Sequence, residues 1–234
     1  MMFREGREAM ADEVKDYEEK KRRLAAGFKG DFYLHEDDYQ KALAAYMTAF
    51  DKGRLAELGR ICLKWGHPKI AVQALEAAGE KIAELSMIEC GAKCLEWGRI
   101  HDGVFAYQYA KRSSSLTPGQ FAGKYLEKDL FRKCGDAILE RAEKSAERER
   151  MREDAVLAYV IAGRPDKIVA VADMYLREAS LLDNAKKAEV LYDRAASLML
   201  LPEEEPDKME NRFLFPPEAK AKDAAGREEK DGDT

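Results

Sequence analysis

Histidine and cysteine, the residue types most characteristic of metal sites and nucleophilic catalysis, are scarce in this 234-residue chain. They are three histidines and four cysteines: His35, His67, His101, Cys62, Cys90, Cys94 and Cys134. No histidine belongs to an H-E-x-x-H pair or to the Glu-x-x-His pattern of di-iron bundles. Cys90 and Cys94 are one helical turn apart, but a zinc site needs a fourth ligand that the sequence does not offer. We therefore expect buried packing cysteines, no metal and no cofactor.

The chain also lacks the short motifs of common enzymes. There is no G-x-x-x-x-G-K-[ST] loop, no G-x-G-x-x-G after a strand and no G-x-S-x-G elbow. His35 is followed by three acidic residues, a possible ligand cluster, but acidic residues are also favoured at helix starts. Ser113–Gly119 is predicted to be a loop with a helix start instead of a nucleophile. We expect a non-catalytic protein.

Composition predicts a mostly helical, cytoplasmic protein. Charged residues make up 36% of the chain, and Ala, Leu, Glu, Lys and Arg are abundant, as in solvent-facing helices. The segment Pro202–Thr234 holds eleven acidic and six basic residues, so residues 1–201 have no net charge and provide no global field for a polyanion. The cysteines are sparse, and there is neither a signal-like N-terminus nor a membrane-length apolar run, so no membrane association is expected.

Two segments of the chain repeat each other. When Glu57–Ala78 is aligned with Glu89–Ala110, nine of 22 positions are identical. Unrelated sequences would share roughly one or two. The identical pairs include Gly59/Gly91, Cys62/Cys94, Trp65/Trp97 and Gly66/Gly98.

Each copy is predicted to form two helices joined by a tight turn. Gly66 and Gly98 supply the left-handed conformation that ends the first helix, and Pro68 suits the first turn of the second. An earlier copy spans Gly30–Ala49. A weaker later copy lies around Tyr159, Gly163, Ala172 and Tyr175. Between these, an irregular pair is predicted at Thr117–Arg148 with its turn at Cys134-Gly135, and a terminal helix at Ala185–Leu200.

These repeats resemble the tetratricopeptide repeat, whose pattern runs W-x2-L-G-x2-Y, then A-x3-F, then a proline. Leu58-Gly59 and the spacing from Gly30 to Tyr33 match its first part, and Ala42 with Tyr46 matches its second. The opening Trp and the closing Pro are missing, and related helical-hairpin repeats are the alternative. The resemblance implies a right-handed, all-α solenoid of about five antiparallel helix pairs.

The resemblance also implies a binding groove lined by the first helix of each pair. Counting from each small packing residue, the predicted contacts are Leu34, His35, Arg60, Leu63, Lys64, Leu95 and Glu96. Arg60 and Lys64 are one turn apart and could hold one acidic side chain of a partner. The asparagines used by co-chaperone members to grip a C-terminal carboxylate are missing, so that ligand is disfavoured.

Other features allow two interpretations. Trp65 and Trp97 could form a half-exposed ladder, but packing in the seam between hairpins is favoured. Of Tyr107 and Tyr109, one should be partly exposed. The charge-dense segment Glu13–Arg23 is predicted to be a solvated helix, with an RNA-contacting strip as the alternative. Phe213 and Phe215 lie between acidic stretches of the tail and are hypothesised to form a docking motif, or to fold back onto the groove.

We therefore predict three segments: a flexible N-terminus (1–8), a tetratricopeptide-like domain (9–201) and an acidic disordered tail (202–234). The predicted function is a protein–protein interaction scaffold that binds a peptide or a helix in its groove. The alternative is a helical-repeat RNA-binding protein, which would need several Lys or Arg residues on one face. Neither the partner nor the oligomeric state follows from these patterns.

Overall fold

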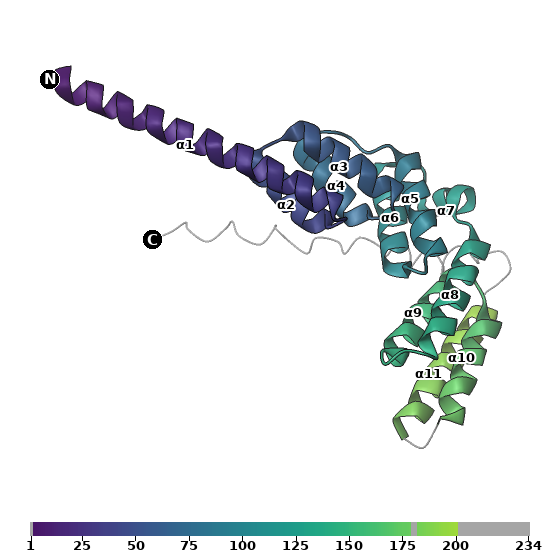
Figure 1. The fold of residues 1–234 in the computed structure, drawn as a ribbon. Coiled ribbons are helices and arrows are strands. Elements are labelled where there is room, and N and C mark those ends of the chain that lie inside the picture. Colours follow the sequence, from purple (N-terminus) through teal and green to yellow (C-terminus); the bar gives the residue numbers. More distant parts are fainter. Residues whose placement is uncertain (1, 179–181, 201–234) are drawn as a thin grey trace, which may run out of the picture.

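The computed structural model describes residues 2–178 and 182–200, with side chains from 14 to 178 and from 183 to 200. The predicted tail, including Phe213 and Phe215, lies outside these residues. The described part is all-helical (Figure 1), and its helices are α1 (Met2–His35), α2 (Tyr39–Ala49), α3 (Lys52–Lys64), α4 (Pro68–Ala78), α5 (Glu84–Glu96), α6 (Ile100–Ser113), α7 (Pro118–Tyr125), α8 (Lys128–Ala142), α9 (Arg148–Ile161), α10 (Pro165–Arg177) and α11 (Leu182–Met199).

These helices pack mainly as adjacent antiparallel pairs, which confirms a helical-hairpin architecture. The pairs are α1/α2, α3/α4, α5/α6, α8/α9 and α10/α11. Neighbouring pairs touch through like helices, because α3 contacts α5, α5 contacts α8, α2 contacts α4 and α4 contacts α6. Figure 1 shows that the helix pairs form a row and that α1 extends from one end of it. The direction of this row changes before α8.

The glycine turns lie where the sequence places them. Gly66 and Gly98 have φ of +63° and +67°, the left-handed region that glycine enters without steric cost. Pro68 begins α4, as predicted, and Pro165 begins α10 after Gly163 in the same way. Asp38 caps α2 by accepting a hydrogen bond from the Lys41 amide, so the acidic residues after His35 mark a helix start. The loop before α7 likewise ends in a helix start at Pro118.

The middle of the chain differs from the prediction. Cys134-Gly135 was expected to be a turn, but it lies within α8, and α8 pairs with α9. Gly135 is a packing glycine, because a Cβ there would come within 2.6 Å of the Tyr159 ring on α9. The predicted later copy is therefore shifted by one helix, since α9 is the second member of its pair. The error arose because a glycine can serve either a turn or a close helix contact.

A tyrosine–aspartate hydrogen bond closes three of the described pairs at the same place. The Tyr46 hydroxyl donates to Asp31 Oδ1 at 2.9 Å, and the Tyr159 hydroxyl donates to Asp136 Oδ1 at 2.9 Å. Tyr192 on α11 donates to Asp173 on α10 in the same way. The next first helix adds a cation to two of these carboxylates: Arg54 lies 2.8 Å from Asp31, and Lys167 lies 3.0 Å from Asp136. Burial and the hydrogen-bonded carboxylate raise the pKa of Tyr46 and Tyr159.

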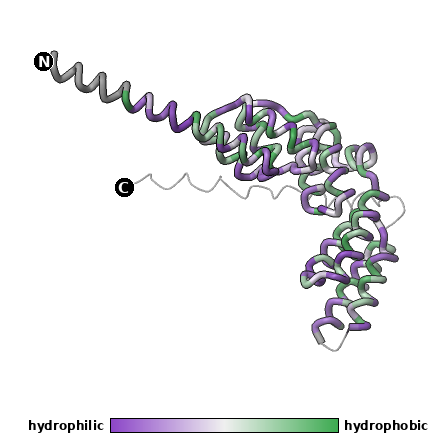
Figure 2. The backbone as a smooth tube through the Cα atoms, in the orientation of Figure 1, coloured by the Kyte–Doolittle hydropathy of each residue, from purple (hydrophilic) through white to green (hydrophobic). Residues whose placement is uncertain are grey.

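The core runs between the two layers of helices. One cluster of buried apolar residues joins α1–α4, and a larger one continues from α4 to α11. Figure 2 shows hydrophobic and hydrophilic stretches alternating along the packed helices. Tyr107 is buried and Tyr109 is partly exposed, as predicted. Among the described helices, none has both the length and the apolar composition for crossing a bilayer.

Both ends of the row of helix pairs are also helical. α1 begins at Met2, so the backbone of residues 2–8 is helical where a flexible segment was expected; the division into three segments stays a prediction. Residues 14–25 are exposed and carry the pairs Lys20–Asp16 and Arg23–Glu19, which confirms a solvated helix there. The predicted terminal helix corresponds to α11.

Replacing Gly135 with alanine should weaken the α8/α9 pair. The added methyl would overlap the Tyr159 ring, at a cost of about 1–3 kcal/mol that exceeds the helix-propensity gain of about 1 kcal/mol. We expect Gly135→Ala to lower the free energy of unfolding, measured by urea denaturation. Gly123→Ala is the matched control, because a Cβ on Gly123 meets no atom within 4 Å and should stabilise slightly. Equal effects of both variants would contradict the assignment of Gly135 to a helix contact.

Candidate functional site

Two half-exposed tryptophans form the most distinctive surface of the row of helix pairs. Trp65 ends α3 and Trp97 ends α5, each directly before a turn glycine. Their exposed fractions are 48% and 44%. The favoured prediction was that both tryptophans are buried in the seam between hairpins. About half of each side chain is instead exposed to solvent, so the alternative of a half-exposed ladder describes them better. Their positions are equivalent, one helix pair apart, as the repeat requires.

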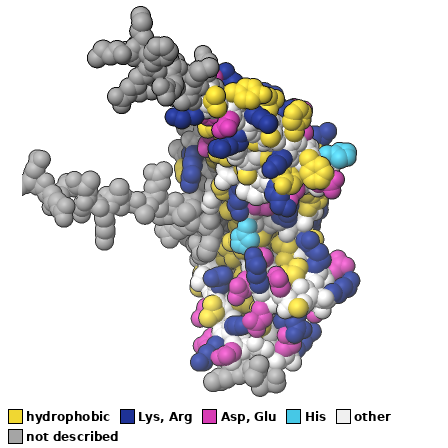
Figure 3. Space-filling view, turned by 60° about the vertical axis from the view of Figure 1, so that its left-hand side comes forward, with side chains coloured by type: hydrophobic (Ala, Val, Ile, Leu, Met, Phe, Trp, Pro, Cys, Tyr) yellow, Lys and Arg dark blue, Asp and Glu magenta, His cyan; other side chains and the backbone are white. Residues whose placement is uncertain are grey.

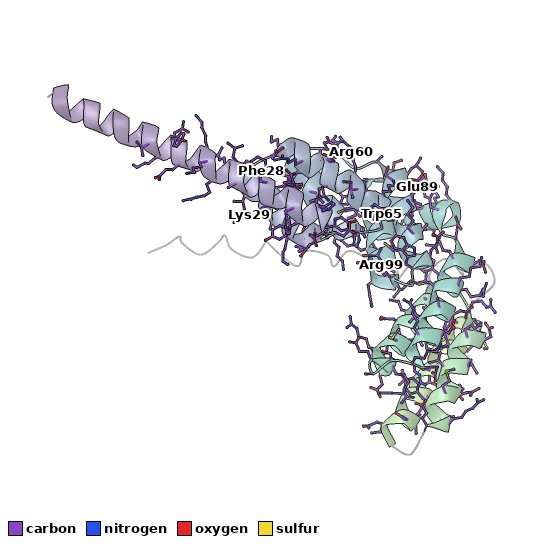
Figure 4. The ribbon with its side chains drawn as sticks, in the orientation of Figure 1. Phe28, Lys29, Arg60, Trp65, Glu89 and Arg99 are labelled. Atoms are coloured by element: carbon purple, nitrogen blue, oxygen red, sulfur yellow. The ribbon has the colours of Figure 1, made fainter. Side chains whose placement is uncertain are left out.

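Arg99, labelled with Trp65 in Figure 4, contacts both tryptophan turns. It follows Gly98 in the turn before α6, and its Nη2 donates to the carbonyl oxygens of Gly66 at 2.6 Å and Trp65 at 3.3 Å. Its guanidinium also lies over the Trp97 ring, 5.0 Å from the centroid. The positive charge therefore neutralises the carbonyl end of α3 and supports the Trp97 ring from one side.

An arginine also contacts the carbonyl end of the first helix in the next pair. Arg141 on α8 donates to the Trp97 carbonyl oxygen at 3.3 Å, so α5 is capped by the following pair as α3 is. A side chain on Gly66 would collide with Arg99 at 2.7 Å, which gives this glycine a second role besides its positive φ. Sequence reasoning missed both arginines. The only available signal was an arginine one residue after the second glycine of the repeat.

Two lysines lie at the end of α3 beside Trp65 or its neighbour Lys64. Lys64 Nζ lies 5.7 Å from the Trp65 ring centroid, and Lys93 Nζ donates to the Lys64 carbonyl oxygen at 3.1 Å. His67 contributes no charge at neutral pH, because burial and then the nearby Arg99 charge lower its pKa. We call Lys64, Trp65, Lys93, Trp97 and Arg99 the tryptophan ladder. It combines two large apolar surfaces with three cations.

The predicted groove residues differ in their exposure to solvent. Leu95 is fully buried, so its assignment to the groove is wrong: it packs across α6, where a Cβ on Gly103 would meet it at 2.7 Å. Leu34 and Leu63 are half-buried and pack against the first core cluster. A residue four positions after the packing glycine returns to the same helix face, which explains why these leucines turn inward.

The remaining groove candidates are exposed: His35, Arg60, Lys64 and Glu96. Arg60 already holds the carboxylate of Glu80 with both oxygens, at 2.8 and 2.9 Å. It is therefore occupied within the chain, and the predicted joint grip of Arg60 and Lys64 on a partner would have to displace Glu80. Of these candidates, only Lys64 belongs to the tryptophan ladder.

The four cysteines are free and buried, as the packing interpretation predicted. The Cys94 thiol donates to the Gly66 carbonyl oxygen at 3.1 Å, which adds to the link between α3 and α5. Burial raises the pKa of Cys62 and Cys134 to about 12. Within the described residues, no three His, Cys, Asp or Glu side chains are grouped to hold a metal ion.

A cavity of about 450 Å³ lies between α9, α10 and α11. Arg152 lines it and is 1% exposed, yet its guanidinium is bound by Glu178 at 2.7 and 2.8 Å and by Glu143 at 3.0 Å. Lys187 in the same lining pairs with Glu149 at 2.9 Å. These carboxylates compensate the charges of Arg152 and Lys187, and the other charged lining residues are Glu153, Lys186 and Arg194.

The described residues thus form a row of helix pairs with an exposed tryptophan ladder. Comparison of the chain with protein-family models, curated proteins and solved structures found no match. The arrangement of adjacent antiparallel pairs supports the helical-hairpin class that the repeat indicates.

Stability should fall as the pH rises above about 9. Burial raises the pKa of Cys62, Cys134 and Tyr107 to about 12, from ordinary values of 9.0, 9.0 and 10.0. The folded chain keeps protons that the unfolded chain loses, so this stabilisation is complete below pH 9 and disappears as pH approaches 12. Each group contributes a slope of up to about 1.4 kcal/mol per pH unit. Urea denaturation between pH 8 and 11 measures this slope.

The double variant Cys62→Ala, Cys134→Ala is the control for this prediction. It should show a shallower loss of stability over the same range, because only the tyrosine contribution remains from this set. A wild-type stability that stays level to pH 11 would contradict burial of these thiols.

Proposed function

We propose that this protein is a non-catalytic scaffold that binds an acidic peptide or helix along the tryptophan ladder. The observation that carries the proposal is the pair of half-exposed tryptophans at equivalent positions, 48% and 44% exposed. Tryptophan is the residue most characteristic of interface hot spots, and large exposed aromatic surfaces are costly without a partner. The tetratricopeptide-like character and the groove on the first helices belong to the same proposal.

The ladder favours a partner with both apolar and acidic side chains. Lys64 lies over the Trp65 ring and Arg99 over the Trp97 ring, and Lys93 contacts the Lys64 backbone. All three cations can form charge-assisted hydrogen bonds with carboxylates. Asp102 compensates part of this charge, because it lies 3.9 Å from Arg99. Apolar anchors on the partner would cover the tryptophans, and one or two acidic residues would set the register.

RNA is the second candidate ligand because the same residues can stack on bases and contact phosphates. The neutral charge of residues 1–201 disfavours it, since sequence-independent affinity for RNA depends on an excess of cations. The two candidates differ in their response to salt and to nuclease.

Replacing both tryptophans should abolish partner binding while leaving the fold intact. The test is affinity capture by the full chain and by the Trp65→Ala, Trp97→Ala variant, each with and without nuclease. Loss of two hot-spot side chains at about 2 kcal/mol or more each predicts a fall in affinity of at least about a thousandfold for the captured protein. The binding constant of the main captured protein is then measured by titration calorimetry.

Leu176→Ala is the matched control, because Leu176 is a similarly exposed apolar residue on α10, at 45%. It should capture the same proteins as the wild type. Captured material that disappears with nuclease would favour RNA, and equal capture by both variants would contradict a role for the ladder.

A further inference from the structure

Helix α1 is much longer than its partner in the chain. It has 34 residues, whereas α2 has 11, so only the C-terminal part of α1 packs against α2. Every residue from 14 to 25 is exposed, and Ala26 is the first buried position among the side chains that the structure describes. Figure 1 shows this part of α1 projecting away from the other helices. A single helix in water gains little stability from its own hydrogen bonds, so such a projection suits a helix with a partner.

The projecting helix carries an apolar stripe on one side. Its members are exposed by 58–69%: Val14, Tyr17, Leu24, Phe28 and Phe32. At about 100° per residue, these five positions and Lys21 fall within an arc of about 80°. The spacing of 14, 17, 21, 24 and 28 alternates three and four residues, which is the pattern of a coiled-coil seam. We call this set the α1 stripe.

The α1 stripe is separate from the face that holds α1 in the fold. Ala26 and Gly30 are buried toward α2, and a Cβ on Gly30 would collide with Tyr46. By the same rotation per residue, these two positions lie roughly opposite Phe28 and Leu24. Helix α1 therefore has two apolar faces, of which only one is covered within the described chain. Figure 3 shows that hydrophobic side chains are also exposed in places over the rest of the molecule. The outer face is large enough to mark an interaction site.

The charges along α1 indicate which partner fits. Residues 14–19 carry three acidic residues, Asp16, Glu18 and Glu19, against one cation, Lys15, and the four basic residues Lys20–Arg23 follow them. Beside the basic half, a hollow of about 440 Å³ between α1 and α2 has only cations among its charged lining residues: Arg22, Lys29 and Lys41. An antiparallel copy of α1 would place each acidic half beside a basic half, whereas a parallel copy would place like charges together.

We propose that the α1 stripe joins two copies of this chain as an antiparallel helix pair centred near residues 19 and 20. In this pair Val14 of one copy lies near Leu24 of the other, and Tyr17 lies near Lys21. Val14, Tyr17 and Leu24 of the two copies face each other in this pair, and Phe28 and Phe32 lie against the N-terminal end of the other copy's α1. If all five exposed apolar side chains of each copy are covered, the contact buries on the order of 1,000 Å² in total, the lower bound for specific interfaces. The tryptophan ladder is not part of this contact, so a dimer would present two ladders.

The first test is the mass of the full chain in solution. Sedimentation equilibrium at tens of micromolar should show twice the mass of one chain. The variant Leu24→Glu, Phe28→Glu should raise the dissociation constant of the dimer by more than about tenfold, because it places charges in the apolar seam. Leu85→Glu is the matched control, since Leu85 on α5 is 59% exposed against 63% for Leu24 and lies outside the stripe.

The second test measures the orientation on otherwise unchanged chains. Lys21→Cys and Phe32→Cys each provide one accessible thiol, because the four native cysteines are buried. In the antiparallel pair, position 21 of one copy faces position 17 of the other, so equivalent residues at position 21 are offset by about 6 Å along the helix, and those at position 32 by about 39 Å. A short bismaleimide should therefore join Lys21→Cys chains and leave Phe32→Cys chains as single chains.

Several outcomes would overturn the proposal. A wild-type chain that stays a monomer at these concentrations would show that the α1 stripe does not join two copies. A dimer that tolerates Leu24→Glu, Phe28→Glu uses a different surface. Crosslinking at both positions would indicate a parallel pair. If the double variant does not fold, as judged by circular dichroism, the mass of the wild type and the two crosslinking variants still decide the question.

Discussion

The helix pairs of this protein depend on close contact between a small residue of the first helix and a large residue of the second. Gly59 receives Leu75, Gly91 receives the ring of Tyr107, and Gly135 receives the ring of Tyr159. Because these glycines have no Cβ, the helix backbones approach closely and the large side chain is buried between them. Three of the described pairs add a tyrosine–aspartate hydrogen bond beside this contact.

A second set of contacts joins one pair to the next. Arg99 and Arg141 reach back to the carbonyl ends of α3 and α5, and Arg54 and Lys167 reach back to the aspartates of the preceding pair. Each link joins a cation to a negative group left by the pair before it. The pairs therefore stack through polar contacts at their ends as well as through the apolar core. One consequence is that Trp65 and Trp97 are held at fixed, equivalent positions while half of each side chain faces solvent.

The two exposed apolar surfaces differ in physical character. The tryptophan ladder lies on the packed body and is bordered by cations, which suits a mixed apolar and acidic ligand. The α1 stripe lies on a projecting helix with separated acidic and basic halves, which suits another helix of the same charge pattern. Since they are formed by different elements, binding at one surface leaves the other available. Self-association through α1 would bring two ladders into one assembly and raise the effective concentration of either for a partner with two motifs.

Local patterns in the amino-acid sequence were sufficient to predict an all-helical chain, the turns at Gly66 and Gly98 and the repetition of helix pairs, because helix periodicity and glycine turns act over a few residues. Only the tertiary structure decided that Gly135 contacts Tyr159, that Leu95 is buried and that the two tryptophans are half-exposed. It also decided the contacts of Arg99 with Gly66 and of Asp31 with Tyr46, which join residues 33 and 15 positions apart. Such contacts depend on how the helices pack, and a single sequence carries no periodic signal for them. Glycine shows the difference most clearly, since the residue that ends one helix is the same residue that lets another approach its neighbour.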